Sequence, residues 1–393
     1  MVWQALVNQP KFSAGTMLLL TDGSVMCHDA SGTYGTNAWW RLTPDGRGSY
    51  VNGTWSSLAP MHHTRLYYAS AVLKDGRVFI AGGEYSDAGD ETNTAEIYDP
   101  LTDNWTEIAA PAGWAEIGDA PCTVLPDGRV LLGHIEDQQT AIYDPAAGTW
   151  SPGAPKGDSS AEESWVLLPD DTILTVQCCA HPGTEKYVVA TNTWISTGNT
   201  PHDLVEAASK EVGAGILLPD GRAFFIGATP YTALYTRGAK PGDAGKWVAG
   251  PPIPTDPKTG KPCGAKDAPA CLMTNGHVLL TVGPVDNVEG DYLGPTYFYE
   301  YGGAGLVMVD APQNAAEWPY DGRMLLLPTG QILYASRTAA LYAYMPHGSH
   351  PDKWRPEILT LSRDLTAGLT YTLTGRQLNG LSQATRSPPD PTN

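Results

Sequence analysis

Acidic residues recur at one position of a repeated pattern, and carboxyl groups gathered in this way could do chemistry. Asp119, Glu162, Asp267 and Asp321 each stand eight residues before a short turn, and Glu211 adjoins the same position of a fifth unit. Such carboxylates could bind a hard metal ion such as Ca²⁺, bind a cationic ligand, or transfer protons to and from a sugar. We assign Asp267 and Asp321 as candidate ligands of a divalent metal.

A second set of reactive side chains surrounds the same position in the second unit. His62, His63 and Arg65 precede Tyr67, which occupies the repeated position, and Tyr85 follows in the next loop. Arg65 could bind the carboxylate of a ligand while His63 or Tyr67 removes a proton, which is lyase-type chemistry. The alternative is that Arg65 donates hydrogen bonds to backbone carbonyl groups of neighbouring units.

The acids also have a purely structural alternative. Lys210, Lys266 and Arg323 stand near them in the sequence and could neutralise them through ion pairs. Carboxylates without such partners repel one another, which raises their pKa values unless a cation lies between them. Unpaired carboxyl groups in a deep cleft would therefore favour catalysis, whereas a flat mouth with every acid paired would favour a binding module.

The elements that must position these residues form a repeat. Seven times an apolar run reaches a turn and a second apolar run follows, with 43 to 55 residues between successive turns. One such unit is a small sheet that cannot bury its own faces, so units stack around an axis. The sequence predicts an all-β, seven-bladed β-propeller. A tryptophan follows each turn, at Trp55, Trp105, Trp150, Trp194, Trp247, Trp318 and Trp354.

The repeat also predicts where the reactive residues lie. The turn lies at one face of the disc, and the start of the preceding strand lies at the opposite face, roughly 23 Å away at about 3.3 Å per residue. Seven such starts would surround the mouth of the axial channel. The sixth unit carries a long insertion, from Asp286 to Asn314, which is rich in Tyr and Gly.

Particular motifs carry two family resemblances. The second unit is similar to a kelch repeat, because it contains Gly82-Gly83, then Tyr98 in a Tyr-Asp-Pro run, and then Trp105. The stretch from His63 to Tyr85 resembles the segment of galactose oxidase that bears its radical tyrosine. That family holds copper with two tyrosines and two histidines, and cross-links one tyrosine to a cysteine.

The galactose-oxidase-like resemblance implies a role for single positions. Tyr67 falls on the cross-linked tyrosine, Tyr320 on the second tyrosine and Tyr85 on the aromatic residue that stacks over the cross-link. Ala14 stands where the cysteine would be, and Asp321 where a histidine would be. The resemblance therefore supports the fold and the location of the site, and argues against a copper radical.

These observations give a domain plan. Residues 1–355 are predicted to form the propeller, with the ring closed by the N-terminal strand around Trp3; the alternative is closure by Trp354. Residues 356–383 are predicted to form a truncated β segment, which by resemblance is a remnant of the immunoglobulin-like domain that follows such propellers. Residues 384–393 are predicted to be a disordered tail.

The predicted site is the axial mouth. The candidate catalytic residues are Tyr67, Asp119, Glu162, Asp267, Asp321 and His63, and the candidate substrate-binding residues are His62, Arg65, Tyr85, Tyr320, Arg323 and Glu211. The first hypothesis is a carbohydrate-active enzyme, either a glycoside hydrolase or a polysaccharide lyase. The alternatives are a non-catalytic propeller that binds glycans or proteins, and a metal-dependent oxidoreductase related to galactose oxidase.

The composition limits the partners. The formal net charge of −18 argues against nucleic acid or an anionic membrane surface, and no apolar run approaches the roughly 20 residues needed to cross a bilayer. We expect a monomer that binds a small molecule or a glycan. No bacterial-type leader is visible at the N-terminus, and we expect an extracytoplasmic or secreted location.

The six cysteines leave the disulfide pattern open. Cys263 and Cys271 flank a short loop and could pair. Cys178 and Cys179 are adjacent, so they could close an eight-membered disulfide ring or lie on opposite faces of a strand. The alternation of side chains along a strand favours opposite faces.

Overall fold

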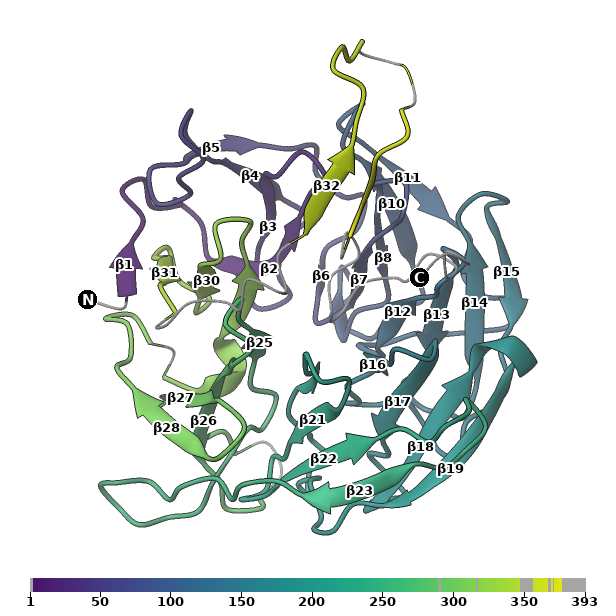
Figure 1. Ribbon diagram of the computed structural model, residues 1–393, viewed down its shortest axis with the longest axis vertical. Coiled ribbons are helices and arrows are strands. Elements are labelled where there is room, and N and C mark those ends of the chain that lie inside the picture. The colour runs from purple at the N-terminus through teal and green to yellow at the C-terminus, as the bar shows by residue number, and fades with distance from the viewer. Residues whose placement is uncertain are drawn as a thin grey trace.

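The computed structural model describes residues 3–288, 291–315, 317–346, 356–366, 369 and 371–376. Seven antiparallel sheets follow one another in chain order around a central axis (Figure 1). The prediction of a seven-bladed β-propeller is confirmed. Apart from two short 3₁₀ turns, η1 (Val189–Thr191) and η2 (Pro319–Asp321), the regular elements of the described residues are strands.

The first four blades take their strands in chain order. Blade one contains β2 (Ala14–Leu19), β3 (Val25–Asp29), β4 (Trp39–Thr43) and β5 (Thr54–Ser57). Blade two contains β7 (Ala69–Val72), β8 (Val78–Ala81), β10 (Ala95–Asp99) and β11 (Asn104–Ile108), with the short pair β6 (Arg65–Leu66) and β9 (Tyr85–Ser86) beside it. Blade three contains β12 (Cys122–Val124), β13 (Val130–Gly133), β14 (Thr140–Asp144) and β15 (Thr149–Pro152). Blade four contains β16 (Val166–Leu167), β17 (Thr172–Val176), β18 (Gly183–Val188) and β19 (Thr193–Asn199).

The last three blades include one enlarged sheet and one shared between the two chain ends. Blade five contains β20 (Gly215–Leu217), β21 (Ala223–Ile226), β22 (Thr232–Thr236) and β23 (Lys246–Ala249). Blade six contains β24 (Cys263–Gly264), β25 (Ala270–Leu272), β26 (Val278–Pro284), β27 (Tyr297–Tyr301) and β28 (Leu306–Val309). Blade seven contains β29 (Arg323–Leu326), β30 (Ile332–Ala335), β31 (Tyr342–Tyr344) and β1 (Trp3–Ala5).

The turn between the two inner strands of a blade is specified locally. In blade two, Oδ1 of Asp75 accepts a hydrogen bond from the backbone N–H of Arg77 at 3.0 Å. Gly76 has φ +88°, a left-handed conformation that glycine adopts without a Cβ clash. In other turns too, the side-chain oxygen of the first residue accepts a hydrogen bond from the backbone N–H group two residues later. These turns begin with Asp22, Asp127, Asp220 and Asn275.

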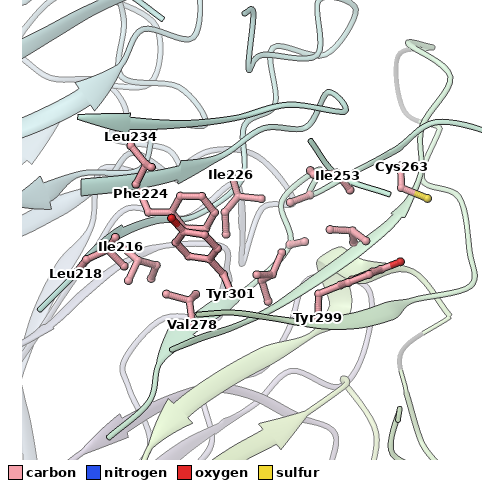
Figure 2. Close-up of a cluster of buried hydrophobic side chains, with 14 residues drawn as sticks. Ile216, Leu218, Phe224, Ile226, Leu234, Ile253, Cys263, Val278, Tyr299 and Tyr301 are labelled. Carbon is pink, nitrogen blue, oxygen red and sulfur yellow. The ribbon is translucent and has the colours of Figure 1, made fainter. Parts of the chain in front are cut away.

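Apolar faces hold neighbouring blades together. Between blades five and six, Phe224 stacks on Tyr301 with ring centroids 4.3 Å apart, and Leu234 and Val278 belong to the same buried cluster (Figure 2). Because each sheet is covered on both faces, the second strand of a blade is a continuous apolar run rather than an alternating one, as in β8 with its four buried residues. This packing fixes the loops that surround the axis.

The N-terminal strand closes the ring. Strand β1 pairs antiparallel with β31 as the outer strand of blade seven. Trp3 Nε1 donates to the backbone oxygen of Asp310 at 2.5 Å, and its ring packs against Phe298 and Tyr344. The first residues therefore complete the sheet that the chain reaches last. Trp354 lies outside the described residues.

Blade six departs from the repeat that the tryptophans suggest. Its outer strand β28 has the sequence LVMV and contains no tryptophan, and Trp318 lies just before η2 in the connection to blade seven. The reading of Trp318 as the closing residue of the sixth unit is wrong, because the insertion places β27 and β28 ahead of it.

A small hairpin follows the propeller. Strands β32 (Glu357–Thr360) and β33 (Thr374–Arg376) pair with each other, and β32 is drawn in yellow at the top of Figure 1. The predicted tail, 384–393, and the end of the segment before it lie outside the described residues. In the part of the chain that the structure describes, no helix is long and apolar enough to span a membrane.

Candidate functional site

A cavity of about 800 Å³ opens at the axial mouth, where the inner strands begin. Segments that precede the first strands of blades two to seven supply its walls. The structure thus brings together residues that are far apart in the sequence. Those proposed from the sequence that line the cavity are Tyr67, Tyr85, Asp119, Glu162, Glu211, Asp267, Tyr320 and Arg323.

Three carboxyl groups meet on one side of this cavity, and we call Glu162, Glu211 and Asp267 the acid cluster. One oxygen atom of each lies within 4.8 Å of the others. The hydroxyl of Tyr292 lies 2.7 Å from Oε1 of Glu211 and 2.9 Å from Oδ2 of Asp267. Oε2 of Glu211 is buried and has no hydrogen-bond partner, an arrangement that is costly for an ionised carboxylate.

The described residues place no basic side chain against these acids. Within the described ranges, no Lys, Arg or His nitrogen lies within ion-pair distance of the acid cluster or of Asp119. Lys266 pairs with Glu206 at 3.6 Å instead, and Arg323 donates to the backbone oxygens of Tyr320 and Gly322, each at 2.6 Å. In the part of the chain that the structure describes, Lys210, Lys266 and Arg323 form no ion pair with Asp119 or the acid cluster, so the alternative in which they neutralise these acids is wrong.

The carboxyl groups of the cavity retain protons more readily than ordinary acids. Burial, followed by the charges of Glu84 and Asp267, raises the pKa of Asp119 to about 8. Burial and the charge of Asp119 raise the pKa of Glu162 well above its ordinary value, and burial and the charge of Asp267 raise that of Glu211. A carboxylic acid that keeps its proton near neutral pH can serve as a proton donor.

The backbone is strained at the same places. Tyr67, Glu162 and Asp267, which share the repeated position, have φ values of 48°, 55° and 48°. Residues other than glycine rarely adopt this left-handed conformation, which costs on the order of 1–3 kcal/mol each and is found most often at functional sites. Three strained residues, each from a different blade, therefore line the cavity.

Two arginines flank Tyr67 in the wall of the cavity. Nη1 of Arg337 donates to the hydroxyl oxygen of Tyr67 at 2.8 Å and lies 3.3 Å from Oδ1 of Asp321. The guanidinium carbons of Arg323 and Arg337 lie 5.9 and 5.8 Å from the centre of the Tyr67 ring. Burial raises the pKa of Tyr67 to about 12, although both arginines act to lower it, so this phenol is protonated at neutral pH.

Arg65 does not reach the cavity, and its assignment to substrate binding is wrong. The side chain is fully buried, because β6 directs it into blade two, where Nη2 binds Oε1 of Glu96 at 2.8 Å. Nη1 donates to the backbone oxygens of Gly82 and Thr94 at 2.7 and 3.0 Å. Arg65 therefore has a structural role within blade two, whereas the alternative expected it to bind carbonyl groups of neighbouring units.

The two histidines are also occupied elsewhere. Nδ1 of His62 lies 2.7 Å from Oε2 of Glu96, and His63 lies between Asp87 and Glu107 at 3.1 and 2.8 Å. Neither histidine lines the cavity. The proposed roles of His63 in catalysis and of His62 in substrate binding do not fit this placement, because both rings turn toward the acids of blade two.

The candidate metal ligands are separated. Asp267 lies in the acid cluster, whereas Asp321 forms an ion pair with Arg337, so the structure does not bring these two acids together as ligands of one metal. Three carboxylates suit a hard cation such as Ca²⁺. Metal binding by Asp267 stays a prediction, which elemental analysis of protein purified without chelator tests.

The copper site of the galactose-oxidase-like family does not fit these residues. Tyr67 and Tyr320 both line the cavity, yet no histidine or cysteine does so among the described residues. Ala14, at the position of the cross-linking cysteine, is fully buried, and Asp321 is paired with Arg337. The donor set that copper requires is therefore missing from the walls of the cavity.

Two residues of the site were missed by sequence reasoning. Tyr292 comes from the insertion of blade six, whose richness in tyrosine was the available signal. Arg337 follows the second strand of blade seven, as Tyr85 follows the second strand of blade two, and both line the cavity. Neither stands at the repeated position, so the repeat could not identify them.

Comparisons with known proteins agree with this architecture. The sequence model of the Kelch motif matches residues 65–111, which correspond to blade two. A kelch-like protein of Aspergillus terreus is 33% identical over 125 residues, covering 30% of this chain and 26% of that protein. An F-box/kelch-repeat protein of Arabidopsis thaliana is 30% identical over 99 residues, covering 25% and 24%. The matched part spans about a quarter of the length of these relatives.

Solved structures show the same fold at low sequence identity. A fungal alcohol oxidase of the AA5 family, in complex with copper, superposes with a TM-score of 0.65 and 14% identity, over 95% of this chain and 83% of that chain. A streptogramin B lyase superposes with a TM-score of 0.57 and 13% identity, over 87% and 96%. The chain is a seven-bladed β-propeller whose second blade matches the Kelch motif and whose fold is similar to that of the AA5 alcohol oxidase.

Proposed function

We propose that this kelch β-propeller is a carbohydrate-active enzyme, a glycan hydrolase or lyase, whose active site is the axial cavity. The observation that carries the proposal is the set of unneutralised carboxyl groups, Asp119 with the acid cluster, in which burial keeps protons on the acids. Fold alone does not determine function, so the argument rests on these residues.

The chemistry follows from the difference between the acids. Asp119, with a pKa raised to about 8, would donate its proton to the glycosidic oxygen as the bond from that oxygen to the anomeric carbon breaks. A member of the acid cluster that gives up its proton would stabilise the positive charge at the anomeric carbon. Water would then add to this carbon and lose a proton to the ionised Asp119. Tyr67, Tyr85, Tyr292 and Tyr320 offer ring faces to sugars and hydroxyl groups for hydrogen bonds.

Hydrolysis is favoured over elimination within this proposal. A lyase that acts on an acidic sugar needs cations to neutralise the substrate carboxylate, and Arg323 and Arg337 could supply them beside Tyr67. Arg337 is already paired with Asp321, and the formal net charge of −18 would repel an anionic polymer. The reaction expected first is therefore proton-assisted cleavage of a neutral or amino sugar.

The test is a screen of glycans against the wild-type protein and two variants, Asp119→Asn and Glu162→Gln. We expect newly released reducing ends with the wild type, and loss of turnover with retained binding in Asp119→Asn, because the amide keeps the shape but cannot donate an acidic proton. Ultraviolet absorbance of an unsaturated product would assign a lyase instead. Tyr231→Phe, an exposed residue outside the cavity, serves as the matched control.

A second candidate is a propeller that binds glycans or proteins without chemistry. The names of the relatives, kelch-like and F-box/kelch-repeat proteins, favour it. In that case a ligand would bind with an affinity that the cavity substitutions change, and no glycan would be cleaved by any variant. Binding without product in the full screen would therefore replace the enzyme proposal with this one.

A further inference from the structure

Cys178 and Cys179 lie in a bend after strand β17, which ends at Val176, and not within the strand. The alternation of a strand therefore does not apply to them, and the expectation that they point to opposite faces is wrong. Their sulfur atoms lie 3.3 Å apart. Two adjacent cysteines thus form a close pair of thiols in blade four.

Neighbouring groups fix this bend. Oδ2 of Asp158 accepts hydrogen bonds from the backbone N–H groups of Cys179 and Ala180 at 3.0 and 2.9 Å. Oγ of Ser159 lies 3.2 Å from the sulfur of Cys179 and 3.8 Å from that of Cys178. These contacts come from the neighbouring side chains of Asp158 and Ser159. Both sulfur atoms therefore face the segment that contains these two residues.

The two thiols differ in access. Cys178 is fully buried, whereas Cys179 is exposed and lines a second cavity of about 800 Å³ beside the axial one. This second cavity also includes Asp158, Ser159 and Glu162, and Glu162 belongs to the walls of both cavities. A small thiol-reactive molecule can therefore reach Cys179 at a place that adjoins the candidate active site.

We propose that Cys178 and Cys179 are a thiol modification site, at which a small disulfide such as oxidised glutathione converts the pair reversibly into a Cys178–Cys179 disulfide. Cys179 attacks one sulfur of the oxidant, which forms a mixed disulfide and releases one thiol. Cys178 then gives up its proton and attacks the sulfur of Cys179, which releases the second thiol. Two cysteine thiols are oxidised, and one oxidant disulfide is reduced to two thiols.

The short spacing explains why the bond would be reversible. Adjacent Cα atoms lie about 3.8 Å apart across a trans peptide, which is less than the roughly 4.4–6.8 Å of ordinary disulfides. A ring closed between neighbours is therefore strained, and strained disulfides are the readily reduced ones. Burial raises the pKa of Cys178, so the second step would be slower than the first at neutral pH.

The bond would also change the wall of the active-site cavity. Formation of the disulfide removes both S–H groups, including the one that Cys178 directs to the backbone oxygen of Ser159 at 3.7 Å. Ser159 stands three residues before Glu162, whose backbone is already in the left-handed conformation. We therefore expect ligand affinity in the axial cavity to differ between the reduced and the oxidised protein.

The experiment treats the folded wild-type protein with oxidised glutathione, blocks remaining thiols, and analyses the unreduced peptide that contains both cysteines by mass spectrometry. The expected product is lighter by two hydrogen atoms and returns to the dithiol on treatment with dithiothreitol. Phenylarsine oxide, which binds two close thiols together, should bind at one equivalent per chain. A persistent Cys179–glutathione adduct without the internal disulfide, or no uptake of the arsenical, would overturn the proposal.

Matched variants locate the effect. Cys178→Ala and Cys179→Ala should each abolish uptake of phenylarsine oxide, whereas Cys263→Ala, which changes a buried thiol of blade six, should leave it unchanged. The wild-type mass measurement does not depend on these variants, so it decides the question even where a substitution impairs folding. Equal uptake by Cys179→Ala and wild type would assign the reactive pair elsewhere.

Discussion

Asp119 combines burial with accessibility from one side. It lines the axial cavity, yet desolvation and the charges of Glu84 and Asp267 disfavour its ionised form. Glu162 and Glu211 share the same direction of pKa shift for similar reasons. Because their pKa values are raised, these acids remain protonated at a pH where exposed carboxyl groups are ionised.

The first prediction concerns the pH dependence of stability. The folded state binds the proton of Asp119 up to about pH 8, whereas the unfolded chain releases it near its ordinary pKa of 3.8, so stability falls as pH rises through this window. Asp119→Asn should reduce the fall in Tm between pH 4 and pH 8, measured by calorimetry, because the amide has no proton to release. The exposed Asp286→Asn is the control, and an unchanged slope in Asp119→Asn would contradict the assignment.

The second prediction concerns the buried ion pair of Arg65 and Glu96. Both side chains are fully buried, so Glu96→Ala would leave the guanidinium without its counter-ion and should cost about 3–5 kcal/mol of unfolding free energy. Urea denaturation measures this loss. The double change Arg65→Met with Glu96→Leu should recover much of it, and a Glu96→Ala variant as stable as the wild type would contradict the structural role.

The site residues predicted from the sequence fall into two groups: those placed by the repeat of strands and turns, and those placed by partners elsewhere in the blade. Asp119, Glu162 and Asp267 line the cavity because strand period and turn position determine where a strand starts, whereas Asp321, at the same position of the repeat, pairs with Arg337. Arg65 and His63 stand only two and four residues from Tyr67 but point into blade two, because their side-chain directions depend on Glu96, Asp87 and the short strand β6. Local spacing could not reveal partners about 20 to 30 residues away.

At the scale of elements, the closure of the ring depends on strand β1. It joins the start of the chain to blade seven, and Trp3 packs between aromatic residues of blades six and seven. The repeat of turns and apolar runs was enough to predict the blades from the sequence. The strands of blade six could not be predicted in the same way, because its insertion supplies the pairing residues and displaces Trp318.

The third prediction follows from this closure. Trp3→Ala removes a buried indole and its hydrogen bond to Asp310, and should cost about 3–5 kcal/mol of unfolding free energy in guanidinium denaturation. Val7→Ala, at a position that is 69% exposed just after the strand, is the control and should change little. Equal stability of Trp3→Ala and wild type would show that β1 is dispensable for the ring.

At the scale of the whole molecule, charge limits what can enter the cavity. The formal net charge is −18, although Asp119, Glu162 and Glu211 in the cavity keep their protons more readily than ordinary acids. A protein with this charge attracts cationic and accepts neutral ligands, and repels polyanions. Segments of six blades line this cleft. The charge of the cleft therefore depends on the whole ring and not on one loop.

The fourth prediction is the salt dependence of binding. Among glycans that bind, an amino-sugar polymer should bind more tightly at low than at high ionic strength, because salt screens its attraction to the net negative charge of the protein. Isothermal titration calorimetry at two salt concentrations measures the difference, and Asp267→Asn should reduce it. A polyanionic glycan that binds more tightly as salt is removed would contradict this account of the cavity.

The most direct test of the central claim is the pH profile of kcat/KM for a glycan that the wild-type protein cleaves. If Asp119 donates the proton, activity should fall as pH rises through about 8, since the acid is then ionised before substrate binds. Asp119→Asn should lose this activity while it still binds the glycan. Activity that continues to rise beyond pH 8, or full turnover by Asp119→Asn, would contradict the account.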